Sequence, residues 1–280
     1  MAKQEQLSKM REAGMMMTAG FQGVGKTYQN MHIIKNYIVG SLITKVKGKK
    51  VLIFDTNGEY TQEQFEENGI SNINPKRIAL EDIGKWSRIP DNNECRRIDA
   101  KALSIKEKKE AIGFIIKNFR LGLVVMEDMN TYITNVTHME AVVSGLINLR
   151  HKACDVLVSY QRLRAVEPLV YSNSRWIRLH YQSDDVYKVF DKIPHPDMYK
   201  IAQLIIDKKY FGGDKRFFVY IYNVDRKIHG DFTKADFQQA CKEYLNQNKK
   251  EIKQYQLTYD LTSEKALESM INNYTQQYFQ

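Results

Sequence analysis

The sequence predicts an α/β fold in which a parallel sheet carries helices on both faces. Apolar runs of strand length alternate with segments in which apolar residues recur at helical spacing, an arrangement typical of such folds. The runs at residues 51–54 and 121–126 are continuous rather than alternating, as in strands that are buried on both faces. With 280 residues, 43% of them hydrophobic, the chain is long enough for one large domain with a substantial core.

The first predicted elements surround a glycine-rich loop. Residues 1–13 are expected to form a polar arm, and residues 14–19 a strand that leads directly into the loop. Apolar residues at helical spacing then predict a helix over residues 25–46, with Gly48 as its C-terminal cap. The next strand covers residues 51–54.

The central part of the chain contains three more predicted strands. Residues 57–103 are punctuated by Asn, Gly and Pro, and we assign them to helix, loop and at most one edge strand. Ser104 and Glu107 fit a capping box, which predicts a helix from this point to about residue 119. The elements that follow are a strand over 121–126, a helix over 137–152, and strands over 155–159 and 176–179.

The C-terminal part of the sequence has a different character. After Asp185, two helical segments, a strand and a short return strand are expected, over residues 185–192, 196–208, 216–222 and 223–230. From Thr233 onward the chain is polar, helical and rich in Gln, Asn, Lys and Tyr, and no core pattern is evident after residue 243. The predicted regions are therefore an arm over 1–13, a core over 14–232 and a helical tail over 233–280.

Composition narrows the classes of partner and compartment. Lys and Arg total 42 against 33 Asp and Glu, and the net charge of +9 suits a polyanion such as DNA, RNA or a membrane surface. Cys95, Cys154 and Cys241 are widely spaced, which predicts neither a disulfide framework nor a zinc site and favours a reducing compartment. No apolar run approaches the roughly 18 residues that a membrane span requires, so a cytoplasmic protein is expected.

The glycine-rich loop is a P-loop of the form G-x-x-x-x-G-K-T, from Gly20 to Thr27. Its glycines allow backbone N–H groups to surround phosphates, and the helix that follows directs its N-terminus at their charge. Lys26 is expected to reach the β- and γ-phosphates of ATP, and the Thr27 hydroxyl to bind Mg²⁺. The candidate nucleotide-binding residues are Gly20, Gln22, Gly23, Val24, Gly25, Lys26, Thr27 and Tyr28.

A second motif is the apolar run 123–126 followed by Glu127 and Asp128, which has the form of a Walker B element. One carboxylate would lie in the Mg²⁺ shell, and the other would orient or deprotonate the attacking water. By position Glu127 is the Mg²⁺-side group and Asp128 the base, although Asp-Glu is the more usual order and the two roles stay interchangeable. A third candidate is Gln161, because an amide just after a buried strand can hydrogen-bond both the γ-phosphate and the water.

These motifs, taken in order, resemble a known superfamily. Asp55-Thr56-Asn57-Gly58-Glu59-Tyr60 is similar to the D-x-H/N-G-E-Y element of HerA-type ATPases. Arg150-His151, followed by a strand and Tyr160-Gln161-Arg162, is similar to a segment of the FtsK–HerA superfamily, except that Leu163 stands where that pattern has proline. Arg175 matches the arginine that precedes the last strand of that family's sheet.

The resemblance implies a RecA-like core, with the Gln161 strand between the Walker A and Walker B strands. It also implies a ring, usually a hexamer, that moves double-stranded DNA through its centre. In such a ring Arg175 is the candidate that reaches the ATP of the next subunit, and Arg150 is its rival. A motor without further domains looks most like the genome-packaging ATPases of tailless, membrane-containing viruses, which would work in the host cytoplasm.

Two other classes of function stay open at this point. A Zot-like or scaffold ATPase would power virion assembly or secretion and act on protein, and a small-molecule kinase or GTPase would share only the P-loop. No Asn-Lys-x-Asp element for reading guanine is present, which counts against a GTPase. The polar tail is expected to dock on a partner, such as a portal, a capsid-vertex protein or a neighbouring subunit.

Overall fold

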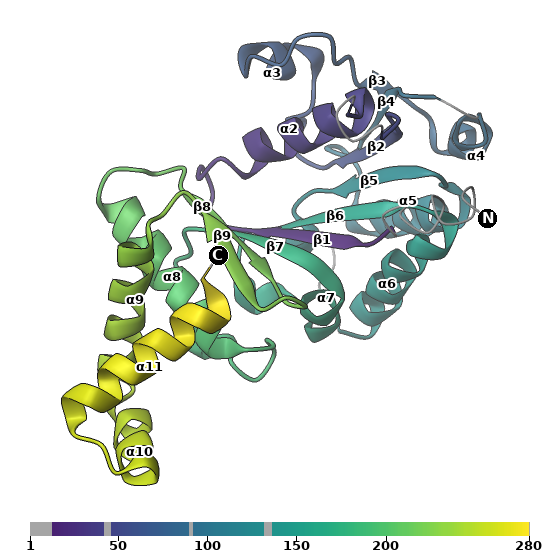
Figure 1. Ribbon diagram of the computed structural model, residues 1–280. Helices are drawn as coiled ribbons and strands as arrows, with labels where there is room; N and C mark the ends of the chain where they lie inside the picture. Colours follow the sequence, from purple (N-terminus) through teal and green to yellow (C-terminus); the bar gives the residue numbers. More distant parts are fainter. Residues whose placement is uncertain (1–12, 42–45, 90–91, 132–135, 280) are drawn as a thin grey trace, which may run out of the picture. The chain divides into compact units, whose positions relative to one another are not determined.

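The computed structural model describes residues 13–41, 46–89, 92–131 and 136–279, and the predicted arm lies largely outside them. The chain divides into two compact units, Met1–Met16 with Thr27–Ser159, and Met17–Lys26 with Tyr160–Gln280. The strands of the described segments follow the order β3-β4-β2-β5-β6-β1-β7-β8-β9 (Figure 1). The predicted α/β fold is confirmed, and β6 lies between β5 and β1, as the resemblance implied for the Gln161 strand.

The first unit is built on parallel strands, and the central ones are buried along their whole length. Strand β2 (Lys50–Asp55) pairs in parallel with β4 (Cys95–Asp99) on one side and with β5 (Gly122–Met126) on the other. Strand β5 in turn pairs in parallel with β6 (Asp155–Tyr160), and the short β3 (Lys76–Arg77) pairs with β4. All residues of β2, β5 and β6 are buried, which explains their continuous apolar runs.

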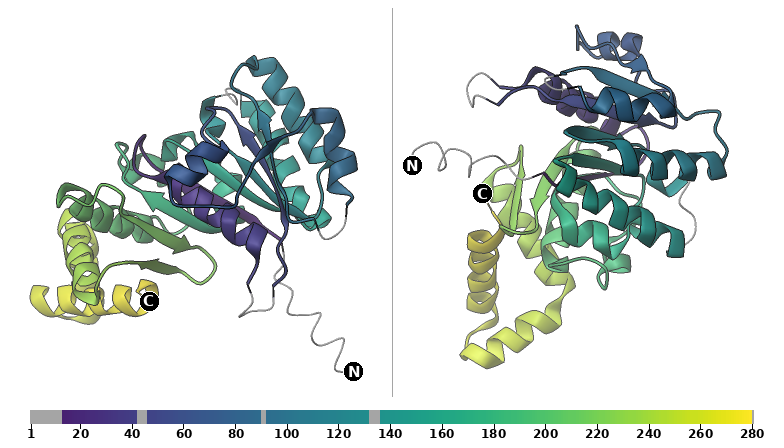
Figure 2. Two further views of the ribbon diagram at one scale, coloured as in Figure 1. Left: turned by 90° about the horizontal axis from the view of Figure 1, so that it is seen from above. Right: turned by 90° about the vertical axis from the view of Figure 1, so that its right-hand side faces the viewer.

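Helices cover both faces of these strands. The connection through α2 (Lys26–Val39) runs from β1 to β2, whereas α5 (Ile105–Asn118) and α6 (Val136–Asn148) connect strands in the opposite direction along the sheet. Because parallel crossovers are right-handed, opposite directions place the helices on opposite faces, as Figure 2 shows for the purple and teal helices. The shorter helices α3 (Gln62–Glu67) and α4 (Ile83–Ser87) lie between β2 and β4 in the chain. The predicted capping box of Ser104 and Glu107 is confirmed.

The predicted end of the first long helix is wrong. Helix α2 stops at Val39, and Gly40 follows with φ +72°, the left-handed conformation that ends helices and that glycine adopts without strain. A Cβ atom on Gly40 would come within 2.4 Å of the Val46 carbonyl oxygen. Ser41 then forms an antiparallel bridge with Val46, so Gly48 does not cap the helix.

The second unit contains the antiparallel strands. Strand β7 (Ser174–His180) pairs with β8 (Phe218–Tyr222), which pairs with β9 (Lys227–Gly230), so the predicted hairpin is confirmed and the sheet is mixed rather than wholly parallel. Helix α8 (Pro196–Phe211) precedes this hairpin, and a short helix α7 (Pro168–Asn173) precedes β7. The helix expected over residues 185–192 is only a 3₁₀ turn, Val186–Val189.

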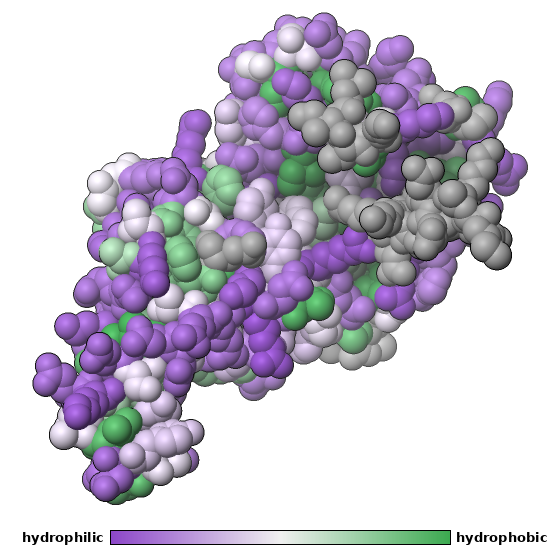
Figure 3. Space-filling model, viewed as in Figure 1, coloured by the Kyte–Doolittle hydropathy of each residue, from purple (hydrophilic) through white to green (hydrophobic). Residues whose placement is uncertain are grey.

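Three helices end the chain: α9 (Lys234–Gln247), α10 (Lys249–Tyr259) and α11 (Ser263–Tyr278). The expectation of no core pattern after residue 243 is wrong, because Leu245, Ala266 and Tyr278 are buried. The Tyr278 hydroxyl donates to Asp197 Oδ2 at 2.6 Å, which joins α11 to the start of α8. The side of these helices that faces the viewer in Figure 3 is mainly hydrophilic. None of the helices in the described ranges is both long enough and apolar enough to span a membrane.

Candidate nucleotide-binding site

The P-loop connects β1 (Met15–Ala19) to α2 and is anchored at its first two residues. The Gly20 N–H donates to the Tyr160 carbonyl at 3.1 Å, and the Phe21 N–H donates to the Tyr181 carbonyl at 2.8 Å. Lys26 Nζ donates to the carbonyl oxygens of Gly20 and Phe21 at 2.7 and 2.9 Å, so the lysine spans the loop and holds its two ends together. This arrangement holds the Lys26 ammonium group against the loop that the motif assigns to phosphate binding.

The glycines of the loop are required by geometry. Gly23 and Gly25 have φ of +81° and +87°, in the region that side chains disfavour. At Gly20 the reason is space, because a Cβ atom would lie 2.6 Å from the His180 Cβ. The Val24 side chain is buried, so only the backbone of that residue is available to a ligand, whereas the Gln22 side chain is exposed.

Two polar residues of β7, Arg178 and His180, pack against the P-loop and the first residue of α2, and sequence reasoning missed both. Arg178 is fully buried, and its Nη2 donates to the Lys26 carbonyl at 3.2 Å while its Nε donates to His180 Nε2 at 3.1 Å. Burial, followed by the positive charges of Arg178 and Lys26, holds the pKa of His180 well below its usual value, so the ring is a neutral acceptor. The available signal was that Arg178 and His180 alternate with the apolar Ile177 and Leu179.

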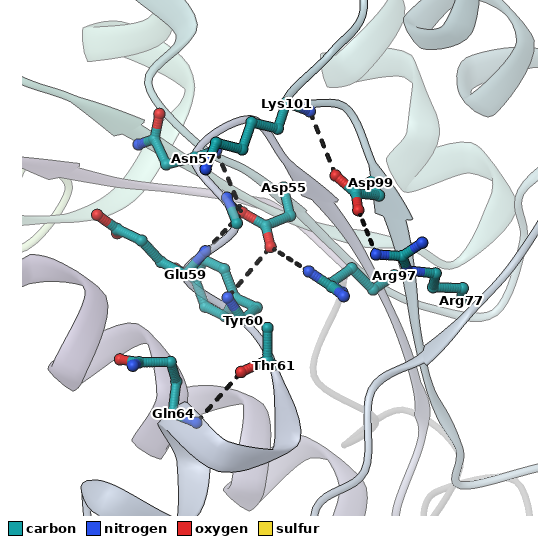
Figure 4. A network of polar contacts seen from close by, with 11 residues as sticks. Asp55, Asn57, Glu59, Tyr60, Thr61, Gln64, Arg77, Arg97, Asp99 and Lys101 are labelled. Atoms are coloured by element: carbon teal, nitrogen blue, oxygen red, sulfur yellow. Dashed lines mark hydrogen bonds and ion pairs between the residues drawn. The ribbon is translucent and has the colours of Figure 1, made fainter.

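In the first unit, Asp55 organises the segment that the sequence singled out as D-x-N-G-E-Y (Figure 4). Asp55 Oδ1 accepts the backbone N–H groups of Asn57, Gly58 and Glu59 at 3.3, 2.8 and 3.1 Å. Asp55 Oδ2 accepts the Tyr60 N–H at 3.1 Å and pairs with Arg97 Nη1 at 3.0 Å. A single buried carboxylate therefore fixes the turn and the direction of the two side chains that follow it.

Those two side chains reach the predicted Mg²⁺ ligands. Glu59 Oε2 accepts a hydrogen bond from the Thr27 hydroxyl at 2.7 Å, and the Tyr60 hydroxyl donates to Glu127 Oε1. Neither Glu59 nor Tyr60 was predicted as a site residue, although both lie in the motif that carried the resemblance. Tyr28, the last of the predicted nucleotide-binding residues, places its ring centroid 4.7 Å from that of His32, edge to face.

Glu127 is buried and is surrounded by neutral hydrogen-bond donors. Besides Tyr60, its Oε1 accepts from Asn30 Nδ2 at 2.8 Å and from Ser159 Oγ at 3.2 Å. Burial raises the pKa of the Glu127 carboxyl to about 7; the Tyr60 hydrogen bond opposes this shift, and the neighbouring Asp128 adds to it. Sequence reasoning missed Asn30, although its position one helical turn after Thr27 puts the two residues on the same face of α2.

Asp128 lies in a constrained backbone position at the end of β5. Its φ of +44° is unusual for a residue with a side chain, and the carboxylate is buried. Asp128 Oδ2 accepts from Asn57 Nδ2 at 2.8 Å. Both carboxylates of the Walker B motif are thus connected to the segment that Asp55 organises.

Gln161 follows the C-terminal end of its strand, β6, whereas Arg150 and Arg175 lie near the N-terminal ends of β6 and β7. Gln161 follows Tyr160, whose carbonyl accepts the Gly20 N–H, so the residue lies next to the one that anchors the start of the P-loop. Arg150 belongs to the 3₁₀ turn Leu149–Lys152 before β6, and Arg175 is the second residue of β7. Tyr181, which anchors the loop, follows the other end of β7, so at about 3.3 Å per residue roughly 20 Å of strand separates it from Arg175.

The candidate Mg²⁺ ligands of the first unit are of the chemical type that this ion binds. The Thr27 hydroxyl and the carboxylates of Glu59, Glu127 and Asp128 are all oxygen donors, which this ion prefers. No cluster of three or more His, Cys, Asp or Glu side chains suited to a metal is found in the described segments. A nucleotide-bound Mg²⁺ does not need one, because phosphates and water supply most of its ligands.

Comparisons with known proteins place the fold. No protein-family model and no curated protein matches the chain. Among solved structures, it is similar to the genome packaging NTPase B204 from Sulfolobus turreted icosahedral virus 2 in complex with AMP, with a TM-score of 0.51, 15% identity, and coverage of 79% of this chain and 98% of that one. The same NTPase in complex with sulfate gives a TM-score of 0.50, 18% identity, and coverage of 79% and 96%. The chain therefore shares its fold with that NTPase, and at this identity the likeness concerns the fold alone.

Proposed function

We propose that this chain binds ATP with Mg²⁺ and hydrolyses it. The observation that carries the proposal is the hydrogen-bonded segment after β2, in which Glu59 contacts the P-loop threonine and Tyr60 contacts the Walker B glutamate. A glycine-rich turn with a purely structural role would not need a second motif that contacts both the P-loop threonine and the buried carboxylate of Glu127. A buried carboxylate whose pKa is raised to about 7, as that of Glu127 is, is a candidate functional group.

Each side chain then has a role in phosphoryl transfer. The P-loop N–H groups and Lys26 hold the β- and γ-phosphates, and Thr27 with Glu127 holds the metal. When bound, Mg²⁺ would neutralise charge that develops on the phosphate oxygens. Asp128 accepts a proton from the attacking water, and the Gln161 amide orients that water against the γ-phosphate.

The work that hydrolysis performs is, in our proposal, the translocation of double-stranded DNA during genome packaging. Support comes from the names of the similar structures, which are packaging NTPases of a virus, and from the net charge of +9. The ordered motifs of the FtsK–HerA type support the same assignment. A motor of this kind must contact many phosphates, so its affinity for DNA should fall steeply with salt.

Measurement of ATP hydrolysis with and without linear duplex DNA, at two salt concentrations, tests the proposal. Wild-type protein should hydrolyse ATP, DNA should stimulate it, and the stimulation should weaken as salt rises. Lys26→Ala should abolish ATP binding, whereas Asp128→Asn should keep binding and lose hydrolysis. Near wild-type hydrolysis by Asp128→Asn would move the role of base to Glu127. Hydrolysis that responds to a partner protein and not to DNA would favour the Zot-like or scaffold alternative.

The ring and its arginine form a separate part of the proposal. We infer that Arg175 acts on ATP held by the neighbouring subunit, because its strand separates it from the P-loop of its own chain. An arginine inserted in this way is worth about 10³-fold or more in rate. Arg175→Ala and Lys26→Ala proteins should each be inactive, and mixed rings should recover part of the activity. Absence of recovery in rings shown by mass to be mixed would exclude Arg175, and Arg150→Ala would then be tested in the same way.

A further inference from the structure

Three aromatic residues of the second unit form a cluster that the proposed chemistry does not use. Tyr181 follows β7, and Tyr210 and Phe211 end α8. The rings of Tyr181 and Tyr210 are stacked, with centroids 3.8 Å apart and planes 6° from parallel. Phe211 stands edge to face against both rings, at 5.6 Å from Tyr181 and 5.5 Å from Tyr210.

The outermost ring of this cluster is open to solvent. Phe211 is 70% exposed, although its ring packs edge to face against two others. Lys215 Nζ lies 4.0 Å from the centroid of the Tyr210 ring and 5.7 Å from that of Phe211. The cluster therefore combines a supported aromatic face with a positive charge, which suits a flat and negatively charged ligand.

The cluster lies beside the P-loop. Tyr181 is the residue whose carbonyl accepts the Phe21 N–H at 2.8 Å. The Arg216 side chain lies near the same loop, because a Cβ atom on Gly25 would be 3.6 Å from the Arg216 Cγ. In Figures 1 and 2 the segment between α8 and β8 accordingly runs next to the turn after β1. The segment from Phe211 to Arg216 therefore borders the P-loop at Phe21 and Gly25.

From this arrangement we propose that Phe211 stacks on the base of the nucleotide whose phosphates the P-loop holds. The inference rests on the proposed nucleotide binding and adds where the base lies. Tyr181 and Tyr210 fix the orientation of the ring, and the positive side chains of Lys215 and Arg216 flank the path from phosphate to base. Because every base has a π-face, stacking alone distinguishes bases poorly, so Phe211 contributes to the binding of ATP and GTP alike.

The test compares a nucleotide with a ligand that has phosphates but no base. Calorimetry with Mg²⁺ measures the dissociation constants of ATP, GTP and inorganic tripolyphosphate for wild type and Phe211→Ala. Loss of one base–aromatic stack should weaken ATP and GTP by about tenfold and leave tripolyphosphate unchanged. Leu257→Ala is the matched control, because Leu257 is 78% exposed in α10 and far along the chain from the loop; it should change none of the three constants.

Conservative variants separate stacking from bulk. Phe211→Trp should keep wild-type affinity for ATP, and Phe211→Leu should behave like Phe211→Ala, because leucine fills space but offers no π-face. Equal affinity for ATP in wild type and Phe211→Ala would overturn the inference, as would an equal loss for ATP and tripolyphosphate. A variant that binds ATP normally but loses duplex DNA would overturn it too, and would assign the cluster to DNA. If the wild-type protein bound neither ATP nor tripolyphosphate, the proposed nucleotide binding itself would be wrong.

Discussion

Two carboxylates that end neighbouring parallel strands differ in what surrounds them. Asp55, at the end of β2, accepts four backbone N–H groups and pairs with the buried Arg97. Glu127, directly after β5, is equally buried but receives hydrogen bonds from the neutral groups of Tyr60, Asn30 and Ser159. A carboxylate matched by a cation serves structure, whereas burial raises the pKa of Glu127 to about 7, so that this carboxyl can respond to a metal or a proton.

The largest expected loss of unfolding free energy is that of Asp55→Ala. Removal of one partner from a buried ion pair leaves Arg97 uncompensated, which typically costs about 3–5 kcal/mol of unfolding free energy. Denaturant unfolding without nucleotide measures the loss. Asp99→Ala is the control, because Asp99 faces Asp55 in the β2–β4 register but pairs with Arg77, which is 74% exposed, so about 1 kcal/mol or less is expected. Equal costs for the two variants would refute the structural role of Asp55.

The next effect is the dependence of stability on pH. The pKa of Glu127 is raised from 4.5 to about 7 in the folded chain, so the folded state holds its proton more tightly than the unfolded state. The protonated Glu127 carboxyl therefore contributes fully to the free energy of unfolding below pH 4.5, and this contribution is lost as pH rises through 7. At 1.36 kcal/mol per pKa unit, the loss is at most about 3 kcal/mol. In Glu127→Gln, unfolding measured without Mg²⁺ from pH 5 to 8 should lose this component. A variant whose pH profile matches wild type would show that Glu127 does not titrate in this range.

Tyr60→Phe tests the same pH dependence, because it should strengthen the dependence that Glu127→Gln removes. Its hydroxyl favours the charged form of Glu127, so removal should raise the pKa of Glu127 further and make the loss of stability at high pH steeper. A loss of about 1–2 kcal/mol is expected at pH 8, with less at pH 5, because hydrogen bonds to a charged acceptor are stronger. Denaturant unfolding of wild type and Tyr60→Phe at pH 5 and at pH 8 measures the two losses. A loss independent of pH would mean that Tyr60 contributes packing alone.

The smallest effect on stability is expected from Glu59→Gln. Glu59 is exposed and accepts only the Thr27 hydroxyl in the contacts described, so less than about 1 kcal/mol of stability should be lost. If the carboxylate serves the metal site, the Mg²⁺ concentration needed for half-maximal ATP binding should rise instead. A large loss of stability with unchanged Mg²⁺ dependence would place Glu59 with Asp55 as a structural residue.

Several features could be predicted because they depend on short stretches of sequence. The P-loop, the capping box of Ser104 and Glu107, and the apolar strands β2, β5 and β6 are local patterns whose spacing in the chain fixes their geometry. The position of the Gln161 strand between the two Walker strands required the resemblance as well. The end of α2 was misjudged because apolar spacing continues past Val39, and only the left-handed Gly40 with the Ser41–Val46 bridge ends the helix.

The sequence by itself determined that this chain has a phosphate-binding loop and an α/β sheet, since both follow from residues close together in the chain. The tertiary structure decided what surrounds Glu127, because its partners Asn30, Tyr60 and Ser159 come from separate elements that no linear spacing relates. It also decided that Tyr181, Tyr210 and Phe211 meet beside the loop. Burial and the desolvation that follows from it are properties of packed neighbours, so the pKa of Glu127 and the exposed stacking face could be known only after the chain was folded.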